Sequence, residues 1–119
     1  MTGLAVDAFR MLGLGDAIPN DFVVPYYLDD RKVRISVARV GGHLYAFDDL
    51  CTCADETCPL SGGLLTGTMI MCQCHGSRFD IVTGAVVNGP ATKPLHMYEV
   101  HEVDGRLRVR LDSSESRSR

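Results

Sequence analysis

Several features that define other classes of protein are missing from this sequence of 119 residues. It has no run of about eighteen apolar residues, so we expect no membrane-spanning helix. It has no basic excess, because 12 Lys and Arg stand against 15 Asp and Glu, and the net charge of −3 argues against a nucleic-acid-binding surface. Residues 1–15 lack the charged start, apolar run and cleavage site of a secretory signal, so we expect a cytoplasmic protein.

Common catalytic motifs are missing as well. The chain contains no G-x-G-x-x-G nucleotide loop, no G-x-S-x-G nucleophile elbow and no H-E-x-x-H zinc helix. Its length leaves room for one domain with a modest core. We therefore expect a small protein that is not an enzyme by itself.

The sequence is richer in strand signals than in helix signals. Val33–Val40 alternates apolar and polar residues, which is typical of a half-buried strand. Pro25 suits an edge strand or a bulge, and Asp104-Gly105 is a strong hairpin signal. The predicted strands are Phe22–Leu28, Val33–Val40, His43–Phe47, Leu64–Leu65, Thr68–Met71, Met97–Val103 and Leu107–Leu111, with strand, turn and strand over Ile81–Val87. Residues 7–12 fit either an edge strand or one helical turn.

All five cysteines lie between residues 51 and 74, in two boxes and the segment that joins them. The first box is Cys51-Thr52-Cys53, and the second is Cys72-Gln73-Cys74-His75. A C-x-C pair and a C-x-x-H pair each place two ligands on one loop, and two such loops facing each other make a four-ligand site. Thiolates and imidazole favour zinc or iron–sulfur clusters over calcium or magnesium.

The second box, together with Ser61-Gly62-Gly63, Phe79-Asp80 and Gly89-Pro90-Ala91, resembles the Rieske-type [2Fe–2S] domain over residues 18–111. The resemblance implies an all-β fold, an antiparallel sandwich or barrel with an inserted cluster-binding subdomain of two loops at about residues 49–90. Residues 1–17 would form an N-terminal segment of edge strand and loop. The tail at 112–119 contains no apolar residue, and we expect it to be disordered.

The first box departs from the family pattern, which has C-x-H there and holds one iron with two cysteines and the other with two histidines. This chain has Cys53 at the histidine position, and two more residues than usual before Cys58-Pro59-Leu60. The resemblance then implies Cys51 and Cys72 on the inner iron, and Cys53 and His75 on the outer one. NEET-type proteins hold [2Fe–2S] with the same kind of ligand set.

Two alternatives stay open at this point. Three cysteines and one histidine also form a common structural zinc site. Alternatively, the cluster has been lost, and Cys53 fills a pocket as a small hydrophobic residue.

The same resemblance assigns roles to residues around the cluster. Cys58 and Cys74 match a pair that forms a disulfide between the two cluster loops in Rieske domains of the cytochrome bc type, although cytoplasmic disulfides are uncommon. Ser77 matches a serine whose hydroxyl donates to a bridging sulfide. Phe79 stands where high-potential members have a tyrosine, so that donor is missing.

Two further positions complete this predicted shell. Leu60 is expected to cover the edge of the cluster, where apolar contact excludes water. The loop at Gly89 and Pro90 matches a proline loop that lies against the cluster as a third wall.

Charge arithmetic predicts a low reduction potential. Two ferric ions and two sulfides carry about +2 in total, so three thiolates leave the oxidised site at about −1, whereas two leave it neutral. We expect a value below the range of about −150 to +300 mV of two-histidine sites, with a pH-dependent branch from the single imidazole of His75.

The predicted function is a soluble one-electron carrier of the Rieske-ferredoxin kind. We expect a flavin-dependent reductase to reduce it and a terminal oxygenase or another oxidoreductase to accept its electrons near His75. Two other functions remain possible: a redox-sensing or cluster-transfer protein, and a small subunit of a larger reductase.

Overall fold

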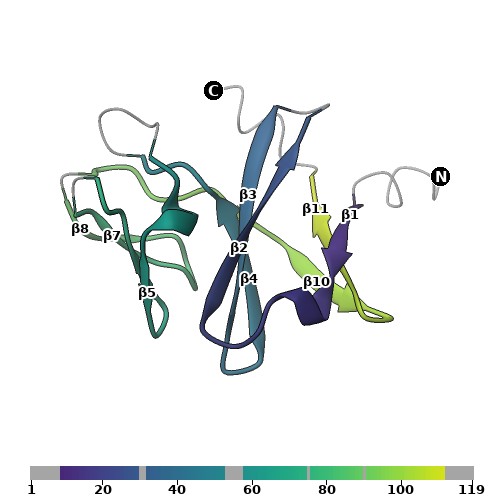
Figure 1. The fold of residues 1–119 in the computed structure, drawn as a ribbon. Coiled ribbons are helices and arrows are strands. Elements are labelled where there is room, and N and C mark those ends of the chain that lie inside the picture. Colours follow the sequence, from purple (N-terminus) through teal and green to yellow (C-terminus); the bar gives the residue numbers. More distant parts are fainter. Residues whose placement is uncertain (1–8, 30–31, 53–57, 75, 90, 112–119) are drawn as a thin grey trace.

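The computed structural model describes residues 9–29, 32–52, 58–74, 76–89 and 91–111, and antiparallel strands dominate them (Figure 1). The predicted all-β fold class is confirmed. The elements are β1 (Phe9–Leu14), the 3-10 helix η1 (Gly15–Ala17), β2 (Phe22–Leu28), β3 (Val33–Val40), β4 (His43–Asp48), the 3-10 helix η2 (Leu60–Gly62), β5 (Leu64–Thr66), β6 (Met69–Met71), β7 (Arg78–Asp80), β8 (Val86–Asn88), β9 (Met97–Tyr98), β10 (Val100–Val103) and β11 (Arg106–Arg110).

Two sheets form what we call the base. One has the strand order β1-β11-β10 and the other β2-β3-β4-β9. Apolar side chains from both sheets make one buried cluster, which includes Ile35, Val37, Ala46, Leu107 and Val109. Because β9 belongs to one sheet and β10 to the other, the chain changes sheets at Glu99 and joins them covalently.

A third sheet, with the order β5-β6-β7-β8, forms a separate layer that we call the inserted subdomain together with η2 and the neighbouring loops. Figure 1 shows it on the left, with the base strands in the centre and on the right. The subdomain leaves the base after β4 and returns at β9, and these two strands pair through Ala46 with Tyr98 and Phe47 with Met97.

Strand β3 is covered on both of its faces. Ile35 and Val37 point into the base core, as the alternating pattern predicts. Ser36 and Ala38 on the opposite face are also 0% exposed, and Ala38 packs in a second core with Phe79 and Ile81 of the subdomain. The inserted subdomain therefore sits on a base sheet through small side chains of β3.

Three local expectations change. Ile81 and Val82 lie in a turn and not in a strand. Asp80 closes this turn, because its carbonyl accepts from the Gly84 N–H at 2.6 Å and its carboxylate accepts from the Val82 N–H at 2.9 Å. The strand expected over Met97–Val103 is split at Glu99 into β9 and β10. The end of the expected N-terminal segment of edge strand and loop is the helix η1.

Other expectations agree with the structure. Residues 7–12 fall partly in the edge strand β1, and Pro25 lies in the edge strand β2. The Asp104-Gly105 turn between β10 and β11 has positive φ at both residues, 54° and 75°, as this type of hairpin requires. Among the described residues, no helix is long and apolar enough to span a membrane.

Candidate metal centre

Two loops of the inserted subdomain each carry a buried cysteine outside any disulfide of the described residues. Cys51 follows β4 and is 1% exposed, and Cys72 follows β6 and is 0% exposed. The backbone N–H of Cys51 donates to the carbonyl of Cys58 at 2.9 Å. Cys72 is held in a tight loop, since its N–H donates to the carbonyl of Ser77 at 2.7 Å and its own carbonyl accepts from Gly76 at 2.9 Å.

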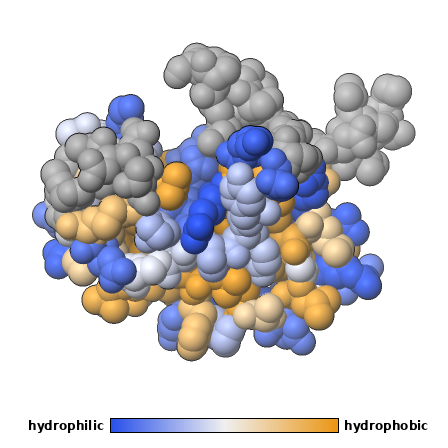
Figure 2. All heavy atoms as spheres, turned by 45° about the horizontal axis from the view of Figure 1, so that its top comes forward, coloured by the Kyte–Doolittle hydropathy of each residue, from blue (hydrophilic) through white to orange (hydrophobic). Residues whose placement is uncertain are grey.

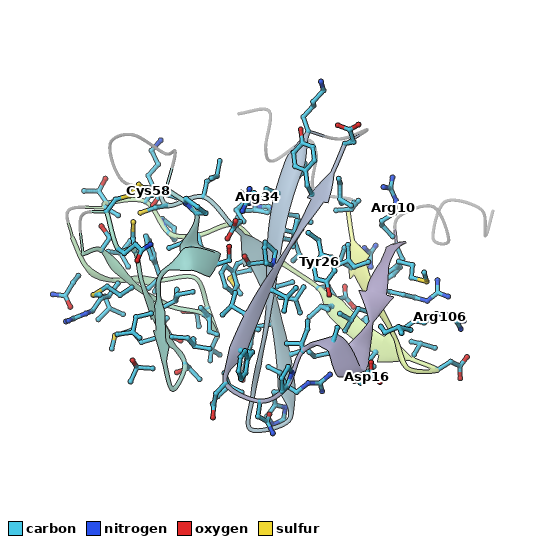
Figure 3. All side chains as sticks on the ribbon, in the orientation of Figure 1. Arg10, Asp16, Tyr26, Arg34, Cys58 and Arg106 are labelled. Carbon is cyan, nitrogen blue, oxygen red and sulfur yellow. A yellow bond between two sulfur atoms is a disulfide. The ribbon has the colours of Figure 1, made fainter. Side chains whose placement is uncertain are left out.

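A disulfide between Cys58 and Cys74 joins the two loops, with a Cα–Cα distance of 6.3 Å. This is the pair that the family resemblance implies. Cys58 is 7% exposed, whereas Cys74 is exposed. Figure 3 shows Cys58 near the upper edge of the subdomain, on the side that faces Arg34 of the base. The bond fixes the first loop against the second beside both buried thiols.

The carboxylate of Asp49 ties the first loop to the base, and sequence reasoning missed it. Asp49 is 0% exposed and precedes Cys51 by two residues. Its side chain accepts hydrogen bonds from Arg34 Nε, from Ser36 Oγ at 2.5 Å, and from the N–H and hydroxyl of Ser61 at 2.7 and 3.1 Å. Arg34 and Ser36 belong to β3, and Ser61 belongs to η2. One buried carboxylate therefore connects the base, the first loop and the subdomain.

The sequence gives only a weak indication that the Asp49 carboxylate is buried. An acidic residue directly before a cysteine box is ordinarily read as a solvated loop residue, because carboxylates are rarely buried without partners. The partners Arg34 and Ser36 lie on a distant strand, and Ser61 follows the first box. The pairing of β3 with β4 brings Arg34 and Ser36 to Asp49. The Leu60 N–H, which donates to the carbonyl of Asp49 at 2.5 Å, brings η2 and Ser61 there.

Ser77 lies in the second loop with its hydroxyl buried. Its Oγ accepts a hydrogen bond from the backbone N–H of Ala91 at 3.0 Å, which holds Ala91 against the second loop. A hydroxyl that accepts one bond still has its own proton to donate. The geometry leaves Ser77 able to donate to a group bound between the loops.

The remaining predicted site residues divide into two groups. Leu60 and Phe79 are 0% exposed and share one apolar cluster with Cys51 and Cys72, so they cover the thiols from within. Gly89 is exposed at the end of β8. Cys53, His75 and Pro90 lie outside the described residues, so their assignments stay predictions.

A shallow cleft of about 200 Å³ opens beside the first loop. Lys32 and Arg34 line it on the base side, and Leu50 and Thr52 line it on the loop side. The Thr52 hydroxyl donates to the carbonyl of Lys93 at 2.6 Å, which fixes the loop against the segment that leads to β9. Cys51 itself lines this cleft, between the base and the first loop. Figure 2 shows hydrophilic and hydrophobic side chains interspersed over one face of the molecule.

The side chains present suit an iron–sulfur cluster. Two buried thiols on facing loops, apolar cover from Leu60 and Phe79, and a donor hydroxyl at Ser77 are what a thiolate-bound cluster needs. Calcium and magnesium require oxygen ligands instead.

Comparison with known proteins agrees with this chemistry. Residues 11–99 match the family described as the Rieske [2Fe-2S] domain. A ferredoxin component of the naphthalene 1,2-dioxygenase system from Pseudomonas putida is 36% identical over 111 residues, covering 93% of this chain and 100% of its own. Ferredoxin CarAc from Metapseudomonas resinovorans is 39% identical over 75 residues, 63% of this chain and 68% of its own.

A solved structure extends the likeness to the fold. It is a complex of reduced oxygenase and oxidized ferredoxin in carbazole 1,9a-dioxygenase, with a chain that superposes at a TM-score of 0.77 and 28% identity. The match covers 87% of this chain and 93% of that one.

The relatives named above are ferredoxins or ferredoxin components of dioxygenase systems, and this chain is likewise a small electron carrier rather than an enzyme. The chain belongs to the Rieske [2Fe-2S] domain family, and its cofactor is a [2Fe–2S] cluster.

Proposed function

We propose that this chain carries single electrons to the terminal oxygenase of a dioxygenase system and receives them from a flavin-dependent reductase. The observation that carries the proposal is the likeness, along nearly the whole chain, to a ferredoxin component of such a system. The complex of oxygenase and ferredoxin supports the oxygenase as the acceptor. The cleft between Lys32 and Leu50 would let such a partner reach the first loop.

The proposed ligands are Cys51 and Cys72 for the inner iron, and Cys53 and His75 for the outer one. The bound cluster supplies a site that gains and loses one electron. Cys51 and Cys72 are buried, as inner ligands would be. Leu60 and Phe79 pack in one buried cluster with both thiols, and the Ser77 hydroxyl, which accepts from Ala91, would donate its own proton to a sulfide.

This ligand set would lower the reduction potential. Three thiolates place one more negative charge beside the irons than two thiolates do, and an added electron is then less stable. Phe79 has no hydroxyl with which to offset that charge. We propose a potential below about −150 mV, the lower end of the two-histidine range, and above about −400 mV, typical of plant-type ferredoxins.

The test compares the natural chain with the variants Cys53→His and Cys53→Ser, all purified without oxygen. Iron content, absorption and electron paramagnetic resonance report the cluster, and redox titration reports its potential. We expect Cys53→His to retain the cluster and to raise the potential by on the order of 100 mV, which is the scale of the gap between the two classes. Cys53→Ser should lose cluster or hold it weakly.

The two variants also separate the alternatives. A natural chain that contains zinc and no iron would contradict the proposed cofactor set. An unchanged potential in Cys53→His would remove Cys53 from the ligands, while leaving the carrier function to be judged by reduction with a flavin reductase.

A further inference from the structure

We infer that the reduced chain contains a second, thiolate metal site, formed by Cys58, Cys72 and Cys74, which binds Zn²⁺ in competition with the cluster. This inference rests on the proposed function only through Cys72, which would be a ligand in both the zinc site and the cluster site. The sulfur atoms of the three residues all lie within 4.8 Å of one another. No other group of three or more such side chains, among the part of the chain that the structure describes, lies as close together.

The spacing suits zinc. A tetrahedral zinc ion holds thiolate sulfurs at about 2.3 Å, which places two of its sulfur ligands about 3.8 Å apart. Cys58 and Cys74 are joined when oxidised and need only a small separation once the bond opens. Cys72 already lies within reach of both. Backbone hydrogen bonds tie Cys51 to Cys58 and close the second loop around Cys72, so each loop has its own support when the disulfide opens.

Formation of the site requires reduction of the disulfide. A dithiol gives two electrons and two protons, the Cys58–Cys74 bond breaks, and two thiols form while the dithiol becomes a disulfide. Zn²⁺ then displaces the thiol protons of Cys58, Cys72 and Cys74. Thiols stay reduced in cytoplasmic compartments, so the reductant is of a common class.

Burial gives the site an open side and a closed side. Cys72 is 0% exposed and Cys58 is 7% exposed, whereas Cys74 is exposed. A metal ion can enter at Cys74 and be held from within by the sulfurs of Cys58 and Cys72. The fourth place is left to water.

Because both sites use Cys72, the zinc ion and the [2Fe–2S] cluster cannot be bound at the same time. The oxidised disulfide leaves Cys72 for iron and sulfide, whereas the reduced pair recruits it for zinc. The thiol redox state of one bond would therefore decide which metal the same loops accept.

The test uses the full-length chain without cluster, reduced by a phosphine, and titrated with zinc against a coloured zinc chelator. We expect about one zinc ion per reduced chain. The same chain with its disulfide intact should bind none at that chelator strength, and this comparison needs no substitution. Zinc-loaded chain should then fail to take up a [2Fe–2S] cluster until the zinc is removed.

Two matched variants locate the ligands. Cys74→Ser should lose zinc binding, while Cys53→Ser should keep it, because Cys53 belongs only to the proposed cluster set. The inference is overturned if zinc binds equally to the oxidised chain, or if Cys53→Ser loses zinc and Cys74→Ser retains it. A wrong assignment of Cys53 as a cluster ligand would be seen in a different measurement, because Cys53→Ser would then keep its full cluster content.

Discussion

Both regions bury an apolar cluster, but the base pairs long strands around its cluster, whereas the inserted subdomain has short strands and adds a disulfide and a buried carboxylate. Base strands β2 and β3 run for seven and eight residues and pair along their whole length. Each strand of the subdomain sheet has only three residues. A disulfide and the four hydrogen bonds to Asp49 hold the loops around that sheet.

This difference has a consequence for function. Short strands contribute little stability by themselves, but they leave the loops free to carry ligands at fixed positions. The base supplies the rigid support, and the subdomain supplies the chemistry. Substitutions in the two regions should therefore affect different measured quantities.

Asp49→Ala should reduce stability most, because it removes the hydrogen bonds that connect the base to the inserted subdomain. It removes a buried carboxylate that accepts from Arg34, Ser36 and Ser61; Arg34 is partly exposed and can be solvated, but each serine donor left buried without its acceptor costs about 1–3 kcal/mol. We expect that loss of free energy of unfolding in chemical denaturation, together with faster cluster loss. Asp29→Ala on an exposed turn is the control and should change neither quantity. Equal behaviour of the two variants would remove Asp49 from its connecting role.

Leu107→Ala should destabilise the base without a specific effect on the cluster. The side chain is 0% exposed within the base core, and truncation there costs about 2–5 kcal/mol. The measurement is the free energy of unfolding beside the reduction potential of the folded protein. We expect the first to fall and the second to stay constant. A changed potential would show that the base core controls the metal centre, contrary to the separation of the two regions.

Replacement of both Cys58 and Cys74 by serine should weaken the subdomain. The bond closes a loop over a sequence separation of 16, and the chain-entropy estimate for a loop of that size is about 3 kcal/mol. We expect unfolding at lower denaturant concentration and a shorter cluster lifetime in air. The oxidised natural chain is the comparison. An unchanged lifetime would mean that the hydrogen bonds of Asp49 and Ser77 suffice to hold the loops.

His101→Ala should have the smallest effect, on an exposed part of the base. The hydrogen bond from His101 lowers the pKa of Glu99, and the charges of His101 and Arg110 act in the same direction. A lowered folded pKa gives a contribution to stability that is present at higher pH and is lost as the pH falls through that pKa. In the variant the pKa of Glu99 should rise toward its ordinary value, as carboxyl resonances followed across the acidic range would show. An unchanged pKa would contradict the assignment.

Much of the base could be predicted from sequence, because its strands carry a clear pattern. The bounds of Phe22–Leu28 and Val33–Val40 agree with β2 and β3. The pattern failed at Ser36 and Ala38, which a period of two places on a solvent face and the structure buries. A sequence window shows which residues suit a buried face, but not that a distant segment will cover the other face.

The metal centre was predictable in a different way. The cysteine boxes and the family resemblance indicated the loops, and residues 11–99 match that family. Asp49 was missed because its partners come from another strand and from η2. Ile81 and Val82 were expected in a strand on their composition, but the hydrogen bonds of Asp80 and Gly84 close a turn there.

The position of the inserted subdomain bears on how this family can vary. The excursion begins after β4 and ends at β9, two strands that are hydrogen-bonded neighbours, so its exit and entry points are fixed by the base alone. The entropy of closing such an excursion grows only slowly with its length, by about 0.6 kcal/mol for each doubling. The two extra residues that the family resemblance indicates before Cys58 would therefore cost the host sheet little, and new ligand spacings could arise there without change to the base.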